Sequence, residues 1–294
     1  MDLRVLNYFM TVAREKTISR AAETLYLSQP ALSKQLKELE AELGVQLFIR
    51  GNREITLTEE GTYLVNRGKE ILSLVETTTA NLKKNDIIGG DITIGGGETQ
   101  AFQFISRILN VLLEQYPEIN VHLYSGNADD IKEKIDKGLL DFGLVIDPVE
   151  KQKYDYLPLP LSDRWGILIN DCHPLACKTQ ITSADLVDQP LLISSQSLVD
   201  NQLADWLGGN LSNYNVVGTY NLLYNASVLV KYGQTIALCI DGIINTKNLG
   251  LTFIPFAPPL TANTSVIWKK NGTFSNVARL FFNELVHSAS QENR

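Results

Sequence analysis

The sequence predicts two folded domains, a small and mainly α-helical one followed by a larger α/β domain. Residues 1–58 contain three short amphipathic helical patterns and one hairpin pattern, and residues 59–84 contain a single long helical pattern. From Asp91 onward, apolar strand patterns alternate with helical patterns, which is typical of an α/β domain. The length of 294 residues is sufficient for two domains.

Charge is distributed unevenly along the chain. The net charge is −7, yet residues 1–58 hold 8 Lys and Arg against 7 Asp and Glu, and residues 59–84 are neutral. The remaining residues hold 14 basic against 22 acidic side chains. Because attraction to phosphate needs local positive charge and not a basic whole, only the first block is suited to contact nucleic acid.

The composition is that of an ordinary globular protein, with 44% hydrophobic and 20% charged residues. No apolar run approaches the ~18–20 residues of a membrane span, and the opening MDLRVLNYF lacks the pattern of a signal peptide. The three cysteines are too few for a disulfide framework. The sequence therefore predicts a cytoplasmic protein.

The first two helical patterns are short and closely spaced. The first covers residues 3–15, and its apolar face consists of Leu3, Leu6, Phe9, Met10 and Ala13. The second runs from Ile18 to Leu25, where Thr17 or Ser19 can cap the first turn. Tyr26 to Ser28 then form a connection of turn length.

The third helical pattern has an apolar face and a polar, cationic face. Ser28 is a suitable N-cap, Pro30 is tolerated in the first turn, and Gly44 suits the exit. The apolar face consists of Leu32, Leu36, Leu39 and Leu43, and the opposite face of Pro30, Ser33, Lys34 and Lys37. Two short helices, a tight turn and such a third helix are the parts of a helix-turn-helix, whose second helix reads base edges in the major groove.

Three polar side chains on this helix suit base recognition. Gln29 can form a bidentate pair with adenine, Lys34 can reach guanine or phosphate, and Ser33 can bond either. The alternative is an ordinary small helical domain whose charges face water. The agreement of cap, turn and cationic face in their expected order favours DNA binding.

The segment FIRGNREITLT predicts a hairpin of two short strands around the turn-forming pair Gly51-Asn52. Arg50 and Arg53 flank its tip. A basic hairpin beside a recognition helix is a wing, and its arginines suit phosphate or the minor groove. The first domain is therefore predicted to be a winged helix-turn-helix.

The stretch from Phe9 to Gly61, with SRAAETLYLSQPALSKQLKELEAELGVQLFIR followed by LTEEG, resembles the signature of LysR-type transcriptional regulators. The resemblance implies that Gln29, Pro30, Ser33, Lys34 and Arg53 lie at the DNA. Many members carry arginine at the position of Lys34, and lysine lacks the planar fork of arginine. The full set of predicted DNA contacts is Ser28, Gln29, Pro30, Ser33, Lys34, Lys37, Arg50 and Arg53.

Residues 59–84 predict a long helix that Thr58 caps and that Glu59 and Glu60 favour in the first turn. Its apolar stripe consists of Leu64, Ile71, Leu72, Val75 and Leu82. A helix of about 25 residues without proline is long for a globular domain and suggests a dimerising element. In the LysR family this linker helix pairs two subunits, which implies a homo-oligomer and most simply a tetramer. The alternative is a helix packed on its own domain.

The strands of the α/β domain are short and apolar. They are expected in DITIG, NVHLY, DFGLVI, RWGILI, PLLIS, TIALCI and SVIWK, with helices between. DFGLVI is fully apolar after its first residue, as in a parallel strand buried on both faces. The alternation of strand and helix patterns predicts a doubly wound α/β arrangement.

A weaker resemblance to LysR effector domains covers GLLDFGLV, HPLA at residues 173–176 and the final helix with Leu280, Phe281, Phe282 and Leu285. It implies the type II fold of periplasmic solute-binding proteins, in which two subdomains enclose a cleft. The crossovers would lie near Leu161 and Ala262. The implied boundaries are 1–58 for the winged domain, 59–88 for linker and hinge, and 89–294 for the effector domain, with subdomain I at about 89–161 and 263–294 and subdomain II at about 162–262.

Ligands of open α/β sheets bind beyond the carboxyl ends of the strands, at helix N-termini. The residues expected there are Gly97, Glu98, Thr99, Gln100, Asn127, Ser194, Ser195, Ser197, Tyr220 and Tyr224. Free N–H groups and hydroxyls suit a small anion, although ordinary loops have the same composition. Glu98 departs from the family, which usually has an uncharged residue there, and it could hold a ligand amine.

Other chemistries lack their motifs. Gly95 to Gly97 form no dinucleotide fingerprint, because Gln100 replaces the third glycine. Cys172, His173 and Cys177 make an incomplete metal site, and the two cysteines are at most a redox pair. No nucleophile, base and orienting group occur at a recognisable spacing. We therefore expect no enzyme, cofactor or metal.

The sequence thus predicts a DNA-binding transcription regulator that a small polar metabolite modulates. Its predicted partners are promoter DNA, the effector and further copies of the chain, with RNA polymerase as a candidate and no membrane. The alternative is a solute-binding protein for transport, which would need a signal peptide or lipid anchor. An enzyme built on the α/β domain is the third hypothesis.

Overall fold

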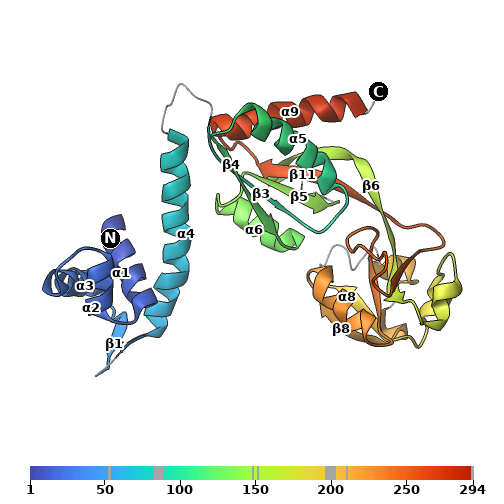
Figure 1. The fold of residues 1–294 in the computed structure, drawn as a ribbon, viewed down its shortest axis with the longest axis horizontal. Coiled ribbons are helices and arrows are strands. Elements are labelled where there is room, and N and C mark those ends of the chain that lie inside the picture. The colour runs from blue at the N-terminus through green and yellow to red at the C-terminus, as the bar shows by residue number, and fades with distance from the viewer. Residues whose placement is uncertain are drawn as a thin grey trace. The chain divides into compact units, whose positions relative to one another are not determined.

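The structure is a computed structural model. It describes residues 1–51, 54–82, 89–147, 149–150, 152–195, 203–209 and 211–292. The chain forms two compact units, Met1–Lys83 and Lys84–Arg294 (Figure 1). Within the described ranges, none of the helices combines the length and apolar character that a transmembrane span requires.

The first unit contains the three predicted short helices, α1 (Leu3–Glu15), α2 (Ile18–Thr24) and α3 (Gln29–Leu43). Both predicted N-caps are confirmed, because the Thr17 hydroxyl accepts from the Arg20 N–H and the Ser28 hydroxyl from the Ala31 N–H. Gly44 ends α3 with a φ of 70°, a left-handed conformation that favours glycine. Local capping chemistry therefore sets the limits of these helices.

The core of the first unit is formed by α1, α2, α3 and the hairpin. Leu32, Leu36 and Leu39 of α3 are buried, whereas Leu43 is 38% exposed, so the predicted apolar face is one residue too long. The rings of Phe9 and Phe48 lie 5.1 Å apart and join α1 to the first hairpin strand. This core fixes the polar face of α3 toward solvent.

The predicted hairpin consists of β1 (Phe48–Arg50) and β2 (Ile55–Leu57), which pair antiparallel. The predicted helix that follows is α4 (Glu59–Leu82). The Thr58 hydroxyl accepts from the Gly61 N–H at 2.9 Å, which confirms Thr58 as its cap. In the stripe predicted for dimerisation, Leu64, Ile71 and Leu72 pack against the core of their own unit.

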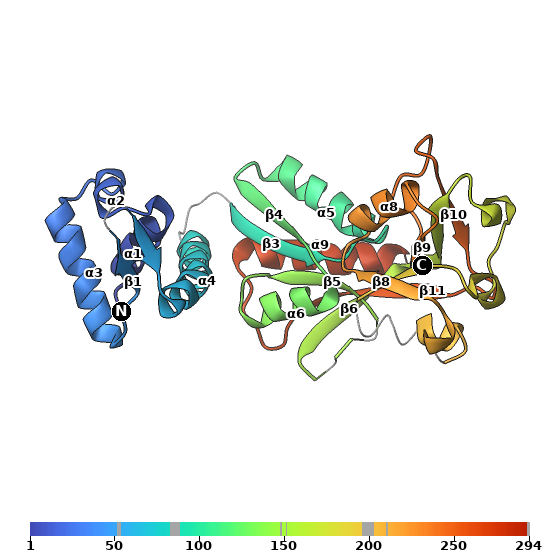
Figure 2. The same ribbon diagram turned by 90° about the horizontal axis from the view of Figure 1, so that it is seen from below.

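The second unit begins with a parallel three-stranded arrangement. β3 (Gly90–Gly96) pairs parallel with both β4 (Ile119–Ser125) and β5 (Phe142–Ile146). Helices α5 (Phe102–Gln115) and α9 (Asn276–Glu292) pack on one face, while α6 (Ala128–Asp136) packs on the other (Figures 1 and 2). The residues of β5 up to Val145 are buried, as predicted for a strand covered on both faces.

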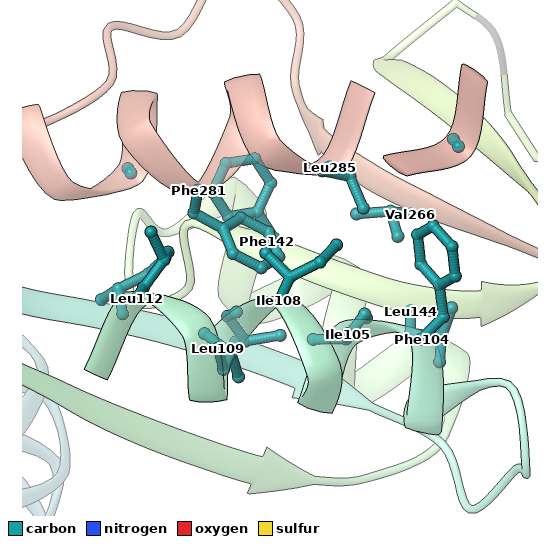
Figure 3. Packing of buried hydrophobic residues seen from close by; sticks show 14 of the residues in the cluster. Phe104, Ile105, Ile108, Leu109, Leu112, Phe142, Leu144, Val266, Phe281 and Leu285 are labelled. Carbon is teal, nitrogen blue, oxygen red and sulfur yellow. The ribbon is translucent and has the colours of Figure 1, made fainter. Parts of the chain in front are cut away.

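Aromatic and aliphatic side chains fill the space between α5, α9 and the sheet (Figure 3). Phe142 lies at the centre of this core, with its ring 4.9 Å from Phe281 and 5.2 Å from Phe274. Ile105, Ile108 and other apolar residues of α5 face it. This core makes the first part of the second unit a rigid platform for the loops at its strand ends.

The remaining part of the second unit has its own parallel strands. β7 (Leu191–Ser194) pairs parallel with β8 (Val216–Tyr220) and β9 (Ile236–Ile240), and α8 (Leu223–Lys231) packs beside them. β10 (Leu251–Pro255) pairs antiparallel with β6 (Tyr154–Asn170). Short 3₁₀ turns occupy Pro174–Cys177, Ser183–Leu186 and Leu211–Asn213.

Two long antiparallel strands, β6 and β11 (Thr261–Lys269), belong to both parts. The strand order is β4-β3-β5-β11-β6-β9-β7-β8, with β10 attached to β6. The predicted crossover residues Leu161 and Ala262 lie on these strands, and Ala262 pairs with Asp163. The sequence reading missed β8, β10 and the first half of β6, whose segment DYLPLPLS contains two prolines.

Gly61 permits the close approach of α4 to the segment before the hairpin, since a Cβ there would lie 2.2 Å from the Leu47 carbonyl oxygen. We predict that Gly61→Ala lowers the free energy of unfolding of the first unit by about 1–3 kcal/mol through overpacking. The gain in helix propensity of roughly 1 kcal/mol is smaller than this cost. Hydrogen exchange of peptides from residues 3–24, followed by mass spectrometry, measures the effect locally.

Gly68→Ala in the same helix is the matched control. A Cβ at Gly68 would lie 3.0 Å from the Met10 sulfur and 3.2 Å from Leu6 Cδ1, and these are side-chain ends that can shift by a small amount, unlike the backbone oxygen that Gly61 meets. Exchange should therefore stay close to the wild-type rate. Equal protection in both variants would contradict the proposed role of Gly61.

Candidate functional site

The N-terminal half of α3 presents a polar, solvent-facing surface. Ser28, Gln29, Pro30, Lys34 and Lys37 are exposed, and Ser33 is half-buried. The Ser28 hydroxyl is used as the helix cap, at 3.4 Å from the Ala31 nitrogen. The exposed side chains can contact a large ligand such as a nucleic acid.

Lys34 is the most prominent cation of this surface, with a side chain that is 76% exposed. Its ammonium lies 3.8 Å from the Glu38 carboxylate, one turn along the helix. An exposed pair of this kind contributes little and exchanges readily for another anion. Lys34 can therefore turn from Glu38 to a phosphate or a base edge.

Glu40 joins α3 to the hairpin, a role that the sequence analysis missed. Its carboxylate accepts from the backbone N–H of Leu47 at 2.7 Å and of Phe48 at 3.3 Å. These bonds satisfy two donors at the start of β1 and orient the hairpin on α3. No local pattern reveals such a bond, because its partners are seven and eight residues away.

The two arginines predicted for the wing lie at or beyond the end of β1. Arg50 is the last residue of β1, and Arg53 lies outside the described residues. The neighbouring Gly51 N–H donates to the Glu54 carbonyl at 3.0 Å, which closes the hairpin next to them. The hairpin thus carries both arginines at its tip by sequence position.

A cavity in the second unit lies where the carboxyl ends of its parallel strands meet. The space between its walls is about 590 Å³, a figure that includes the solvent at its open side. Loops after β3, β4 and β8, the last residue of β7 and the first turn of α8 contribute to its walls. Its lining comprises Gly97, Glu98, Thr99, Gly126, Asn127, Ala128, Leu144, Val145, Ile146, Trp165, Ser194, Tyr220, Asn221, Leu222, Leu223, Ile240 and Ile243.

The structure brings together six of the ten residues expected at a ligand site, namely Gly97, Glu98, Thr99, Asn127, Ser194 and Tyr220. Gln100, Ser195 and Tyr224 do not line this cavity, and Tyr224 is 67% exposed on α8. Ser197 lies outside the described residues. Trp165, from the long strand β6, lines the cavity although the sequence analysis did not consider it.

Three of these polar side chains already form bonds that hold the fold. The Thr99 hydroxyl donates to the Asp163 carboxylate and accepts from the Ala101 N–H at 3.0 Å. Asn127 caps α6 by accepting from the Asp130 N–H at 2.9 Å. The Tyr220 hydroxyl donates to the Leu238 carbonyl. Substitution of these residues would therefore alter the walls of the cavity as well as its polarity.

The loop after β3 reaches across the cavity to the other part of the unit. The Glu98 carboxylate accepts from the backbone N–H of Leu223, at the first turn of α8. The Gln100 amide donates to the Asp241 carbonyl at 3.2 Å. Glu98 was expected to be available for a ligand amine, and here one of its oxygens is used by the helix.

Two buried polar atoms near the cavity have no hydrogen-bond partner among the described residues, the indole nitrogen of Trp165 and the Thr264 hydroxyl. Trp165 is 2% exposed, and Thr264 is fully buried. Thr264 lies opposite Ile146, a residue of the cavity wall, in the β11–β5 register. Only Trp165 of the two lines the cavity. Because buried polar groups are nearly always partnered in proteins, its indole nitrogen is the atom that calls for a partner at this site.

The described residues contain no cluster of three or more His, Cys, Asp and Glu side chains that could hold a metal ion. Cys172 and Cys177 are exposed free thiols, and the Cys177 thiol lies 3.2 Å from the Pro174 carbonyl. Cys239 is buried, and burial raises its pKa well above the ordinary value. A buried thiol of this kind is unreactive.

Two family models match the chain. "Bacterial regulatory helix-turn-helix protein, lysR family" covers residues 3–62, and "LysR substrate binding domain" covers residues 86–290. The first match contains α1, α2, α3 and the hairpin, and the second contains the whole lining of the cavity.

Individual proteins match over nearly the full length. The Hca operon transcriptional activator HcaR of Escherichia coli (strain K12) is 32% identical over 278 residues, or 92% of each chain. A probable RuBisCO transcriptional regulator of Thalassiosira pseudonana is 28% identical over 298 residues, or 96% of each chain.

Solved structures share the fold. Full-length CbnR in complex with its target DNA has a TM-score of 0.75 at 19% identity and covers 98% of this chain and 100% of its own. Full-length BenM has a TM-score of 0.56 at 23% identity and covers 99% of this chain and 96% of its own. The predicted fold class, a helix-turn-helix domain followed by a two-part α/β domain, is confirmed.

The bond between Thr99 and Asp163 leads to a prediction on pH dependence. Burial raises the pKa of Asp163, against the lowering effect of its bonds with Thr99 and Gln100. Because the folded-state pKa is raised, this group destabilises the fold progressively as pH rises from its unfolded pKa through its folded pKa. Asp163→Asn removes the charge and keeps an acceptor for the Thr99 hydroxyl.

We expect Asp163→Asn to match the wild type near pH 4 and to gain stability relative to it as the pH rises to 7. Thermal unfolding followed by tryptophan fluorescence across this range measures the difference, because all three tryptophans lie in the second unit. Asp155→Asn, on the same strand, serves as the control. If Asp163→Asn instead loses stability relative to the wild type as the pH rises, the ionised Asp163 carboxylate stabilises the fold and the prediction is wrong.

Proposed function

The chain belongs to the LysR family of transcriptional regulators, and we propose that it reads promoter DNA with α3 and the hairpin under the control of a small polar metabolite bound in the cavity of its second unit. Its family joins a DNA-binding helix-turn-helix to an effector-binding domain. Its relatives are regulators and not transport proteins, which sets aside the solute-binding alternative. As a member of this family, the protein would regulate transcription and not catalyse a reaction. It would act in the cytoplasm.

The exposed N-terminal half of α3 carries the DNA-binding part of the proposal. Gln29, Pro30 and Lys34 face solvent at the end of the helix that enters the major groove in helix-turn-helix proteins. Ser33 and Lys37 extend this face, and Ser28 supplies the cap. The hairpin is tied to α3 through Glu40, so Arg50 and Arg53 would follow the position of the helix on the DNA.

The cavity carries the effector part of the proposal. Its walls come from both parts of the second unit, and apolar side chains alternate there with amide and hydroxyl groups. Concave sites of this composition typically bind small organic molecules. A ligand would act by favouring one closure of the two parts, with a coupling free energy of roughly 1–3 kcal/mol.

The regulator would act as a homo-oligomer, most simply a tetramer built from α4 pairs and contacts of the effector domain, with RNA polymerase as a further partner. The exposed Leu74 on α4 and the half-exposed Val75 support a helix pair. Their neighbours Leu64, Ile71 and Leu72 pack on their own unit, so the pairing surface would begin beyond them.

We predict that Lys34→Ala weakens binding to the specific operator by about 1–3 kcal/mol, because a base contact is lost. Arg53→Ala should weaken all DNA sequences more uniformly and reduce the salt dependence, as expected for a phosphate contact. Fluorescence anisotropy with genomically mapped operator DNA, at two or more salt concentrations, separates the two effects.

Lys247→Ala is the control, since it removes the same charge from an exposed position in the second unit. Its affinity should equal that of the wild type. Unchanged affinity in both Lys34→Ala and Arg53→Ala would contradict the assignment of α3 and the hairpin.

The oligomer is tested by light scattering coupled to size exclusion. We expect a mass of four chains at micromolar concentration, and paired half-sites in the operator about 34–36 Å apart or at a multiple of that distance. Leu74→Glu should shift the population toward smaller species, because it places a charge on the proposed pairing surface. A monomeric wild-type chain would exclude this assembly.

A further inference from the structure

We propose that the effector is not a carboxylate but a neutral or amine-bearing molecule that presents a hydrogen-bond acceptor to Trp165, because the Glu98 carboxylate already occupies the anion position at the start of α8. This inference rests on the proposed effector role of the cavity. It specifies the chemical class of the ligand, which the fold alone leaves open.

The N-terminus of α8 is already supplied with an anion. The first N–H groups of a helix have no partner within the helix, and the helix dipole makes this end attractive to an anion. Residue 222, the N-cap, is a leucine and forms no side-chain cap. Glu98 supplies the missing anion from the opposite wall by accepting the Leu223 N–H. A ligand carboxylate at this point would meet a charge of the same sign.

The charge of the described cavity wall is negative. Glu98 is the only charged side chain among the described residues that line the cavity. The nearby Arg164 lines a different hollow and pairs with Asp241 at 2.7 Å. The described lining residues therefore offer an anionic ligand no cationic side chain, whereas they offer an amine one carboxylate with unused acceptor capacity.

Trp165 supplies a polar group that a ligand can satisfy. The indole N–H of Trp165 is a donor only, it is buried, and it has no partner among the described residues. The residue lines the cavity, and an unpartnered buried donor carries a desolvation cost. A carbonyl, hydroxyl or ether oxygen of a ligand would remove that cost without bringing a negative charge near Glu98.

The experiment compares three probes of nearly equal shape, butyrate, butyramide and 3-aminopropanamide, which are anionic, neutral and cationic and each of which carries an oxygen that can accept the Trp165 indole N–H. The full-length protein carries indole-¹⁵N tryptophan, so that each of its three tryptophans gives one indole N–H signal. Trp165→Phe assigns the signal of interest. The shift of this signal with probe concentration gives an affinity at this site.

For the wild type we expect butyramide or 3-aminopropanamide to move the Trp165 signal, and butyrate to bind at least about tenfold more weakly than the better of the two. Glu98→Ala frees the α8 N-terminus and should strengthen butyrate and weaken 3-aminopropanamide, each by about tenfold. Glu98→Gln keeps an acceptor for the Leu223 N–H, so it should weaken 3-aminopropanamide but strengthen butyrate less than Glu98→Ala does.

Asp129→Ala is the matched control, because it removes an exposed carboxylate from α6 that does not line the cavity. It should leave the order of the probes unchanged. Equal or stronger binding of butyrate to the wild type overturns the ligand class but leaves the cavity as the effector site. If the three probes leave the Trp165 signal unmoved in every variant, Trp165 is not a ligand contact and the inference is wrong. If they move only Trp206 or Trp268, the cavity itself is the wrong effector site.

Discussion

The antiparallel pairing of β6 with β11 is the constraint on which the second unit depends. Both strands run through the two parts, and the Ala262–Asp163 pair lies where they pass from one to the other. Each part keeps its own apolar core on either side of this passage. Relative motion of the parts must therefore be absorbed by a few residues of two paired strands, where the register of β11 shifts between Asn263 and Ser265.

This constraint explains why polar residues at the cavity form hydrogen bonds that hold the two parts together. Thr99 is bonded to Asp163 at the passage, while Glu98 and Gln100 reach the other part through a helix N–H and a backbone carbonyl. One loop thus bonds to the connecting strand and to the far wall. A ligand can change the balance between closures only through bonds that differ between them, and this loop holds several of the candidates. Trp165 follows two residues after Asp163, so a ligand contact there would act directly on the connecting strand.

The sequence predicted those parts of the fold that depend on local chemistry. Thr17, Ser28 and Thr58 cap their helices as expected, and the apolar run of β5 identified a strand covered on both faces. Non-local features were missed. Glu40 acts on residues seven and eight positions away, Trp165 is an ordinary core residue by its pattern, and β8 alternates in burial on a partly exposed edge. The cleft could be placed because ligands of α/β sheets bind beyond the carboxyl ends of the strands. The hydrogen bonds among its side chains could not be predicted, because they depend on the register of strands that are distant in the sequence.

The charge of the first unit bears on how such a protein holds DNA. Residues 1–58 have almost no net charge, and acidic Glu38 lies beside Lys34 on the reading surface. Affinity from counterion release grows with the number of phosphates neutralised, so it depends on the few cations of this surface and not on the net charge of the domain. Two or more copies on one operator would add their contacts, with an effective concentration set by the linkage between them. In the oligomer proposed above, binding would then depend on the spacing between copies, and a change of closure in the effector domains would act by altering that spacing.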